Sequence, residues 1–289
     1  MSDKQPGRMQ HAARNGDQEA LLPGVRNVIA VASGKGGVGK STTAVNLALA
    51  LHQGGATVGI LDADVYGPSL PRMLNVPRMP NNNEGGENGI LPVDVFGIKA
   101  ISMGFFVPED APMVWRGPMV GMAVEQLLRD VDWGILDYLI VDLPPGTGDA
   151  QLTLTQKVPL TGVVIVSTPQ DVALADVKKG INMFRKVDVP VLGIIENMSY
   201  YICSHCGHRA EIFSHGGARR QAEAEGMTFL GEIPLDQVIR EDADSGHPIV
   251  VAHPDAPQSV VYRQIAAALV ERVDAINHDA ADAPRIVVE

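Results

Sequence analysis

The stretch VASGKGGVGKST, residues 31–42, contains a phosphate-binding loop and decides the fold. Residues 34–41 fit the pattern G-x-x-x-x-G-K-[ST] and lie between an apolar run typical of a strand and a helical pattern. In such a loop, glycines let backbone N–H groups converge on phosphate oxygens, and the amino terminus of the helix adds partial positive charge. The sequence therefore predicts that a nucleoside triphosphate is the ligand.

Individual positions of this loop have predicted roles. Lys40 is expected to neutralise β- and γ-phosphate oxygens, and the Ser41 hydroxyl is a candidate magnesium ligand. Lys35 is unusual, because the general pattern requires one lysine and this stretch contains two. The residues expected around the phosphates are Gly34, Lys35, Gly36, Gly37, Val38, Gly39, Lys40, Ser41 and Thr42.

Short runs rich in Val, Ile and Leu alternate with helical patterns along the chain. Because the runs are continuously apolar, each predicts a strand covered on both faces, and hence a mainly parallel sheet. We expect a single α/β domain with a doubly wound sheet and ligands at the carboxyl ends of its strands. A helix of about three turns should follow the phosphate loop. The predicted strands are 27–33, 56–64, 98–104, 138–144, 162–169, 190–198 and 228–234.

Three segments are predicted to lie outside this winding. Residues 1–24 are polar and predict a flexible tail, so the P-loop domain is expected over residues 25–278, followed by a tail over 279–289. Residues 75–97 are crowded with Pro, Asn and Gly, which predicts a loop or a small hairpin outside the main winding.

The composition indicates a globular protein without a basic surface. The chain has 289 residues, 45% of them hydrophobic, and a formal net charge of −11. Nucleic acids and anionic membranes attract basic surfaces, so we expect neither as a partner. No stretch is apolar enough for a spanning helix or for the core of a signal peptide, so we expect a cytoplasmic protein.

Carboxylates follow two of the predicted strands. Asp62 and Asp64 face the same way, because strand residues two apart share a side. Asp142 ends another buried run and is a candidate to hold magnesium, usually through water. Gly146 and Gly148 then allow the next segment to approach the γ-phosphate. The alternative for these aspartates is that they cap turns.

The only two cysteines, Cys203 and Cys206, form a C-x-x-C pair suited to a soft metal. A [4Fe–4S] cluster takes four cysteine ligands, so an all-cysteine site requires a second chain. Three alternatives remain: a zinc site completed by His208 or His215, a thiol–disulfide exchange pair, and a pair of inert thiols.

The segment GKGGVGKS resembles the deviant phosphate loop of the family that includes the nitrogenase iron protein, the ParA and MinD partition ATPases and the Mrp/ApbC-type iron–sulfur cluster carriers. The resemblance implies a two-fold nucleotide sandwich, in which Lys35 reaches the nucleotide held by the other subunit. Four further segments narrow it to the Mrp/ApbC-type carriers: DADVYGPSLPRML, MVWRGPM, DYLIVDLPPGTGD and the C-x-x-C.

The resemblance also implies roles for individual residues. Asp64 would position the attacking water, with Asp62 near the magnesium shell. Asn197 would hydrogen-bond the adenine base, with Pro234 and Asp236 near the ring. A structural turn is the alternative for Asn197. The WRGPM segment includes Arg116, to which we assign no role.

These observations predict a homodimeric, slowly hydrolysing ATPase that requires Mg²⁺. It would hold a [4Fe–4S] cluster between its subunits and deliver it to apo iron–sulfur proteins, after loading by upstream cluster-assembly proteins. One alternative is a ParA/MinD-like positioning ATPase, although the acidic end ERVDAINHDAADAPRIVVE lacks the basic amphipathic helix that would favour it. Another is a zinc-stabilised nucleotide switch.

Overall fold

The computed structural model describes residues 21–76, 89–106 and 117–281, and an eight-stranded sheet forms its centre. The strand order is β10-β7-β6-β1-β5-β2-β4-β3, and every pairing is parallel except that of β3 with β4. The predicted single-domain α/β fold with a mainly parallel sheet is confirmed. The strands are β1 (Val25–Ala32), β2 (Val58–Asp62), β3 (Val93–Val95), β4 (Ile98–Ser102), β5 (Leu136–Asp142), β6 (Gly162–Ser167), β7 (Val191–Glu196) and β10 (Phe229–Glu232).

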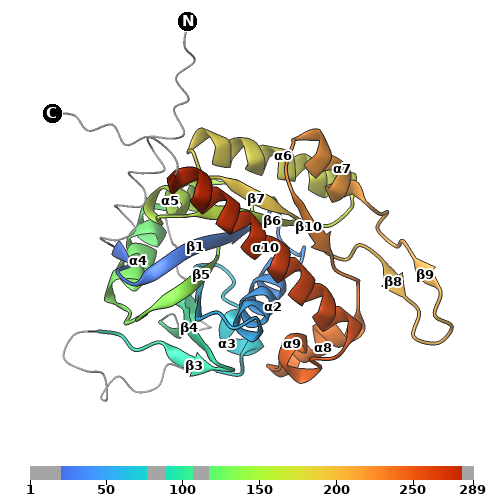
Figure 1. Ribbon diagram of the computed structural model, residues 1–289, viewed down its shortest axis with the longest axis horizontal. Coiled ribbons are helices and arrows are strands. Elements are labelled where there is room, and N and C mark those ends of the chain that lie inside the picture. The colour runs from blue at the N-terminus through green and yellow to red at the C-terminus, as the bar shows by residue number, and fades with distance from the viewer. Residues whose placement is uncertain (1–20, 77–88, 107–116, 282–289) are drawn as a thin grey trace, which may run out of the picture.

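Helices cover both faces of the sheet, which explains why its strands read as continuous apolar runs. One apolar core lies under α2, α3, α8, α9 and α10, and the other under α4, α5, α6 and α7. Figure 1 shows α10 crossing the sheet on the first of these faces. The helices are α2 (Lys40–Gln53), α3 (Leu70–Met73), α4 (Gly117–Asp130), α5 (Asp149–Lys157), α6 (Asp171–Lys186), α7 (Gly217–Ala224), α8 (Gln237–Ser245), α9 (Ile249–Ala252) and α10 (Pro257–Ala281), with a 3₁₀ turn at Met103–Phe105.

One edge of the sheet corrects the expectation for residues 75–97. Part of that segment is a strand, β3, which pairs antiparallel with β4 and extends the sheet instead of lying outside it. The chain reverses through Phe96 and Gly97, which have φ angles of +50° and +84°. A two-residue turn with positive φ at both positions matches the right-handed twist of the strands that it joins, so β4 follows β3 directly and pairs with it. Residues 77–88 lie outside the described part.

The described structure also extends past the expected ends of the domain. Leu22, which we placed in the flexible tail, is 2% exposed and packs in the core. At the other end, α10 continues to Ala281, beyond the expected end at residue 278. Helix α2 has 14 residues, longer than expected, because it begins at Lys40 within the phosphate loop itself.

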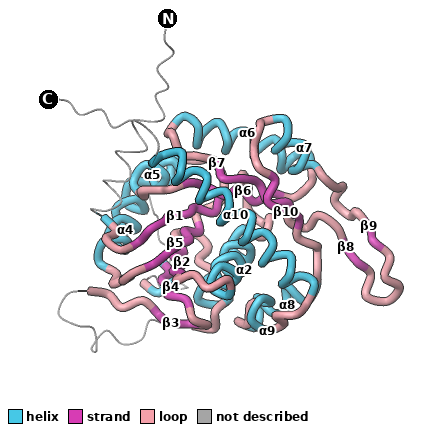
Figure 2. The backbone as a smooth tube through the Cα atoms, viewed as in Figure 1, coloured by secondary structure: helices cyan, strands magenta, loops and turns pink. Residues whose placement is uncertain are grey.

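A small two-stranded hairpin, β8 (Tyr201–Ile202) and β9 (Arg209–Ala210), carries the C-x-x-C. In Figures 1 and 2 it projects from the body of the domain, beyond β10. It follows β7, on the side of the sheet where the carboxyl ends of the parallel strands lie. The hairpin and the phosphate loop therefore belong to the same end of the sheet.

Candidate functional site

The glycines of the phosphate loop serve two physical purposes. Gly37 and Gly39 have φ angles of +77° and +78°, which glycine adopts without strain. A side chain at Gly36 or Gly37 would meet nothing within 4 Å, so this surface of the loop is open to a ligand. A side chain at Gly34, in contrast, would come within 2.6 Å of Asp176 on α6. Gly34 therefore permits close packing of the loop, while Gly36 and Gly37 leave room for phosphates.

Lys40 forms a buried ion pair at the start of α2. Its Nζ lies 2.5 Å from Asp142 Oδ1 and 3.2 Å from Ser41 Oγ, and the side chains of Lys40 and Asp142 are 6% and 2% exposed. The structure thus brings together three of the predicted site residues from β5 and α2. Phosphate oxygens entering this loop would compete with Asp142 for the Lys40 ammonium.

Asp62 lies beside Asp142 in the register of β2 and β5 and is fully buried. Its Oδ2 accepts hydrogen bonds from the backbone N–H groups of Ser69 and Leu70, both at 3.1 Å, and from Ser102 Oγ at 3.0 Å. Burial, followed by the nearby Asp142 charge, raises the pKa of Asp62 to about 7. Asp62 therefore organises the chain that leaves β2, and its place near a magnesium shell stays a prediction.

Asp64 is 7% exposed and caps the turn after β2. Its Oδ1 accepts from the backbone N–H groups of Tyr66 at 3.2 Å and Gly67 at 3.3 Å. Burial raises the pKa of this carboxyl, against the opposing effect of Lys40. The structure shows the capping interaction that was the alternative for Asp64, and the positioning of water by the same carboxylate stays a prediction.

The loop after β5 contacts the start of the phosphate loop. The N–H of Gly146 donates to the carbonyl of Ser33 at 2.9 Å, and its φ angle is +96°. A side chain at Gly146 or Gly148 would meet nothing within 4 Å. The two loops are therefore adjacent, with bare backbone at both glycines, as an approach to the γ-phosphate requires.

Asn197 lies directly against the phosphate loop. Its Nδ2 donates to the carbonyl of Val38 at 2.8 Å, and its Oδ1 accepts from the N–H of Met198 at 2.9 Å. A side chain at Gly39 would come within 2.1 Å of the same Nδ2. Asn197 is thus engaged by the loop in this structure, and its contact with adenine stays a prediction.

The segment after β10 contains the other two candidate base contacts. Pro234 is buried, and Asp236 is the N-cap of α8. The two oxygens of Asp236 accept from Val238 N at 2.8 Å and from Gln258 Nε2 at 2.6 Å. The structure therefore gives Asp236 a capping role, and its proximity to a base stays a prediction.

Lys35 differs from Lys40 in its surroundings. Its side chain is half-exposed, and within the described part of the chain its ammonium has no hydrogen-bond or ion-pair partner. Thr42, nearby on α2, donates its hydroxyl to Met73 Sδ at 3.8 Å. A lysine without a partner in its own chain is available to a ligand or to another chain.

Arg116 lies outside the described residues.

The two cysteines lie in the turn of the β8–β9 hairpin. The N–H of Cys203 donates to the carbonyl of His208 at 2.9 Å, and the N–H of Gly207 donates to the carbonyl of Cys203 at 2.8 Å. Both thiols are free, with Cys206 exposed and Cys203 half-buried. Hydrogen bonds from the backbone N–H groups of Cys206 and His205 lower the pKa of the Cys203 thiol. The turn thus presents two neighbouring free thiols to the surroundings.

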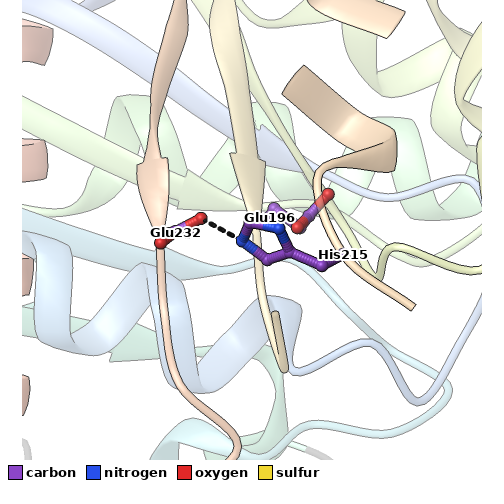
Figure 3. A group of neighbouring side chains, drawn as sticks. All are labelled: Glu196, His215 and Glu232. Atoms are coloured by element: carbon purple, nitrogen blue, oxygen red, sulfur yellow. Dashed lines mark hydrogen bonds and ion pairs between the residues drawn. The ribbon is translucent and has the colours of Figure 1, made fainter. Parts of the chain in front are cut away.

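The structure does not complete this pair with a histidine of the same chain. Within residues 21–76, 89–106 and 117–281, three metal-binding side chains converge in one place only, and that group contains neither cysteine. It consists of Glu196, His215 and Glu232 (Figure 3). His215 is thereby directed to Glu232, with Nε2 to Oε2 at 2.8 Å. A zinc site of the two cysteines with His208 or His215 is not formed here.

A family model described as ParA, NUBPL iron-transfer P-loop NTPase, matches residues 24–270. The chain belongs to this family. An iron–sulfur cluster transfer protein NUBPL of Dictyostelium discoideum is 54% identical to this NTPase over 261 residues, covering 90% of the present chain and 81% of the relative. An iron–sulfur cluster carrier protein of Escherichia coli K12 is 55% identical over 245 residues, 85% of this chain and 66% of the relative.

Two solved structures are similar to this chain. A nucleotide-binding protein of Archaeoglobus fulgidus in complex with ADP is 37% identical, with a TM-score of 0.71 over 86% of this chain and 96% of that one. The cell-division ATPase MinD of Pyrococcus furiosus has a TM-score of 0.64 at 19% identity, over 85% and 98%, and shows the fold alone. In the part of this NTPase that the structure describes, no helix is long and apolar enough to cross a bilayer.

The family model confirms the family predicted from the sequence, but the sequence did not identify every residue of the site. The buried Glu196 and the half-buried Glu232 lie at the carboxyl ends of β7 and β10, and Ser102 ends β4. A glutamate that ends an apolar run, as Glu196 does one residue before Asn197, was an available signal. The partners of these side chains come from distant parts of the chain, so the signal did not identify them.

Proposed function

We propose that this chain is an ATP-binding, slowly ATP-hydrolysing carrier that holds a [4Fe–4S] cluster between two identical subunits and transfers it to apo iron–sulfur proteins. The observation that carries the proposal is the hairpin with two free thiols and no third ligand from its own chain in the described part. Two such hairpins supply the four thiolates that a cubane cluster takes. The relatives described above, an iron–sulfur cluster transfer protein and an iron–sulfur cluster carrier protein, support iron–sulfur cargo.

The nucleotide part of the proposal is supported by the open surface at Gly36 and Gly37 and by the ADP complex of the 37% identical protein. Lys40 would exchange Asp142 for the phosphates, while Ser41 and Asp142 would hold Mg²⁺ directly or through water. These oxygen donors suit that ion, which supplies charge neutralisation of the phosphates when bound. Lys35 has no partner in its own described chain and would stabilise phosphoryl charge on the nucleotide of the partner subunit.

The remaining parts of the proposal rest on these two sites. Adenine would lie near Asn197, Pro234 and Asp236, and Asp64 would position the attacking water. Upstream cluster-assembly proteins would load the hairpins, and apo iron–sulfur proteins would receive the cargo. We propose no nucleic acid and no membrane as partner, in keeping with the net charge of −11. The cytoplasmic location stays a prediction.

Anaerobic reconstitution with iron and sulfide tests the cargo. We expect about four irons per dimer, because four thiolates surround one cubane. Replacing Cys203 or Cys206 by serine should abolish the cluster, since a hydroxyl is a hard, largely protonated ligand, while ATP binding persists. Ser204→Ala, in the same turn, is the matched control and should load normally. One zinc per monomer that is retained in air would favour the zinc switch, and an iron-loaded monomer would contradict the shared site.

Subunit mixing tests the role of Lys35. Lys35→Ala should bind nucleotide but lose turnover, because the removed charge acts on the other subunit. Mixing it with Asp64→Ala should restore part of the activity, since one of the two sites in the mixed dimer then has both residues intact. If subunits exchange and no activity returns, Lys35 acts within its own chain or has no role.

A further inference from the structure

The side chains of Glu196, His215 and Glu232 converge from three elements at the base of the cysteine hairpin (Figure 3). Glu196 ends β7, Glu232 ends β10, and the two are partners in the register of these strands. His215 comes from the segment between β9 and α7. Their ligand atoms lie within 4.8 Å of one another, so the group first suggests a cation site.

The hydrogen bonds of the group argue against a cation. The oxygens of Glu196 already accept from Ser199 Oγ at 2.6 Å, from the N–H of Gly216 at 2.8 Å and from the N–H of Ala218 at 2.7 Å. The guanidinium of Arg209 also lies 2.9 Å from His215 Nε2 and 3.4 Å from Glu232 Oε1, where it would repel a metal ion. The group is therefore a hydrogen-bond network with Arg209 as its positive member.

Arg209 joins this network to the cysteine hairpin. It lies in β9 opposite Ile202, one residue before Cys203, and its guanidinium stacks over the Tyr200 ring at 3.9 Å. None of the residues 202–212 is buried, so no apolar core anchors the outer part of the hairpin. The side chain of Arg209 is thus a charged connection between the hairpin and the end of the sheet, and Glu211, just after β9, adds a contact of 3.6 Å between its Oε1 and His215 Nδ1.

The other end of the network reaches the phosphate loop. Glu196 directly precedes Asn197, whose side chain donates to the carbonyl of Val38 in that loop. Two residues after Asn197, the hydroxyl of Ser199 donates a hydrogen bond to Glu196, and its backbone N–H donates to the carbonyl of Ile233. A shift of the Asn197 segment would therefore move the groups that position Glu196 and Glu232.

His215 provides two alternative arrangements within the network. One ring nitrogen, Nε2, lies within hydrogen-bond distance of both Glu232 Oε2 and Arg209 Nη2. A protonated nitrogen donates to Glu232, whereas an unprotonated one accepts from Arg209, and it cannot do both. Partly exposed contacts of this kind are individually weak, so they form and break readily.

We propose that Arg209, His215 and Glu232 are positioning residues that hold the cysteine hairpin in one orientation and make that orientation depend on nucleotide in the phosphate loop. This inference rests on the ATP-binding part of the proposed function. When nucleotide displaces the Asn197 side chain from the carbonyl of Val38, the end of β7 shifts and Glu196 moves with it. The contacts among Arg209, His215 and Glu232 then change, and the hairpin is released or reoriented. The cluster ligands thereby respond to a nucleotide that does not touch them.

The two-cysteine composition allows a test in protein without iron. In full-length Cys203→Ser protein, a spin label on the remaining exposed thiol, Cys206, reports the mobility of the hairpin. Addition of Mg²⁺ with a non-hydrolysable ATP analogue should change the ratio of ordered to mobile label by about fivefold, the lower range of site-to-site coupling. Binding of a fluorescent ATP analogue is measured on the same samples.

Variants then assign the effect. Arg209→Ala and Glu232→Gln should each make the label mobile without nucleotide and abolish its response, while the double variant should add nothing further. Arg209→Lys keeps the charge and should restore part of the response. The matched control is Arg219→Ala, which removes an arginine that stacks on Phe229 and does not join the network.

Each outcome separates this inference from the proposed function. Loss of the response in the Arg209 and Glu232 variants, with nucleotide binding and the control unchanged, supports it. A normal response in Arg209→Ala, or no response in the labelled parent despite nucleotide binding, overturns it. Failure of the parent to bind nucleotide overturns the proposed ATPase itself, whereas failure to load iron in a separate reconstitution leaves the label result standing.

Discussion

The buried ion pair of Lys40 with Asp142 leads to a stability prediction for the nucleotide-free protein. Replacing Lys40 by methionine keeps most of the aliphatic packing but leaves Asp142, 1% exposed, without its cation and next to Asp62. Removing one partner of a buried pair typically costs about 3–5 kcal/mol, because the other charge stays buried. We expect Lys40→Met to lower the free energy of unfolding by that amount near neutral pH.

The second half of the prediction restores stability. Asp142→Asn added to Lys40→Met removes the unpaired charge and should recover most of the loss, because an apolar or neutral replacement of both partners is often close to neutral. Lys179→Met is the matched control. Its ion pair with Asp176, at 3.0 Å, is made by a side chain that is 68% exposed, so its loss should cost no more than about 1 kcal/mol.

Urea denaturation followed by circular dichroism, without nucleotide or Mg²⁺, measures these differences. A typical domain is stable by about 5–15 kcal/mol, so Lys40→Met should stay folded but unfold at clearly lower urea. The reasoning would be refuted if Lys40→Met cost no more than Lys179→Met, or if Asp142→Asn failed to recover stability in the double variant. Either result would mean that water or a proton already compensates Asp142.

Three further predictions concern single positions. Because the pKa of Asp62 is raised to about 7, its carboxyl binds a proton more tightly in the folded than in the unfolded state. The free energy of unfolding should therefore fall as pH rises from about 4 to about 7, by up to ~1.4 kcal/mol per pH unit. Urea titrations at several pH values should show a flatter dependence on pH for Asp62→Asn, and an unchanged dependence would contradict the raised pKa. Glu196→Gln should lower the free energy of unfolding by about 3 kcal/mol, since it places an amide N–H₂ against a buried donor and removes charge-assisted hydrogen bonds. A decrease below ~1 kcal/mol in the same assay would argue against these hydrogen bonds. Gly39→Ala should abolish binding of a fluorescent ATP analogue, because Gly39 has a φ angle of +78° and its new carbon would collide with Asn197. Binding equal to that of the unsubstituted protein would contradict this.

The sheet was predictable because its information is local. Continuous apolar runs and a strand–loop–helix motif placed β1, β2 and β4 to β7 near their observed positions, along with β10. The short edge strand β3 was missed, since its pairing depends on two positive φ angles at Phe96 and Gly97 and on the free edge of β4. Neither feature has a periodic pattern in the sequence.

For three residues of the candidate site, the sequence predicted that they lie together but not how they are bonded. Lys40, Ser41 and Asp142 meet as the motifs indicated. The sequence did not reveal that Asp62 accepts from Ser102, forty residues away, or that Asn197 donates to Val38 across 159 residues. Such pairs depend on which strands are neighbours in the sheet, and spacing along one chain does not determine that order.

The position of both thiols at the tip of an exposed hairpin has a consequence for handling the protein. A thiol with a lowered pKa, such as that of Cys203, is more often the reactive thiolate, and Cys206 lies exposed beside it. Oxidants therefore reach both sulfurs, and a disulfide between them would remove both proposed cluster ligands of that chain at once. We expect protein purified in air to keep its fold and its phosphate loop but to accept iron and sulfide only after reduction.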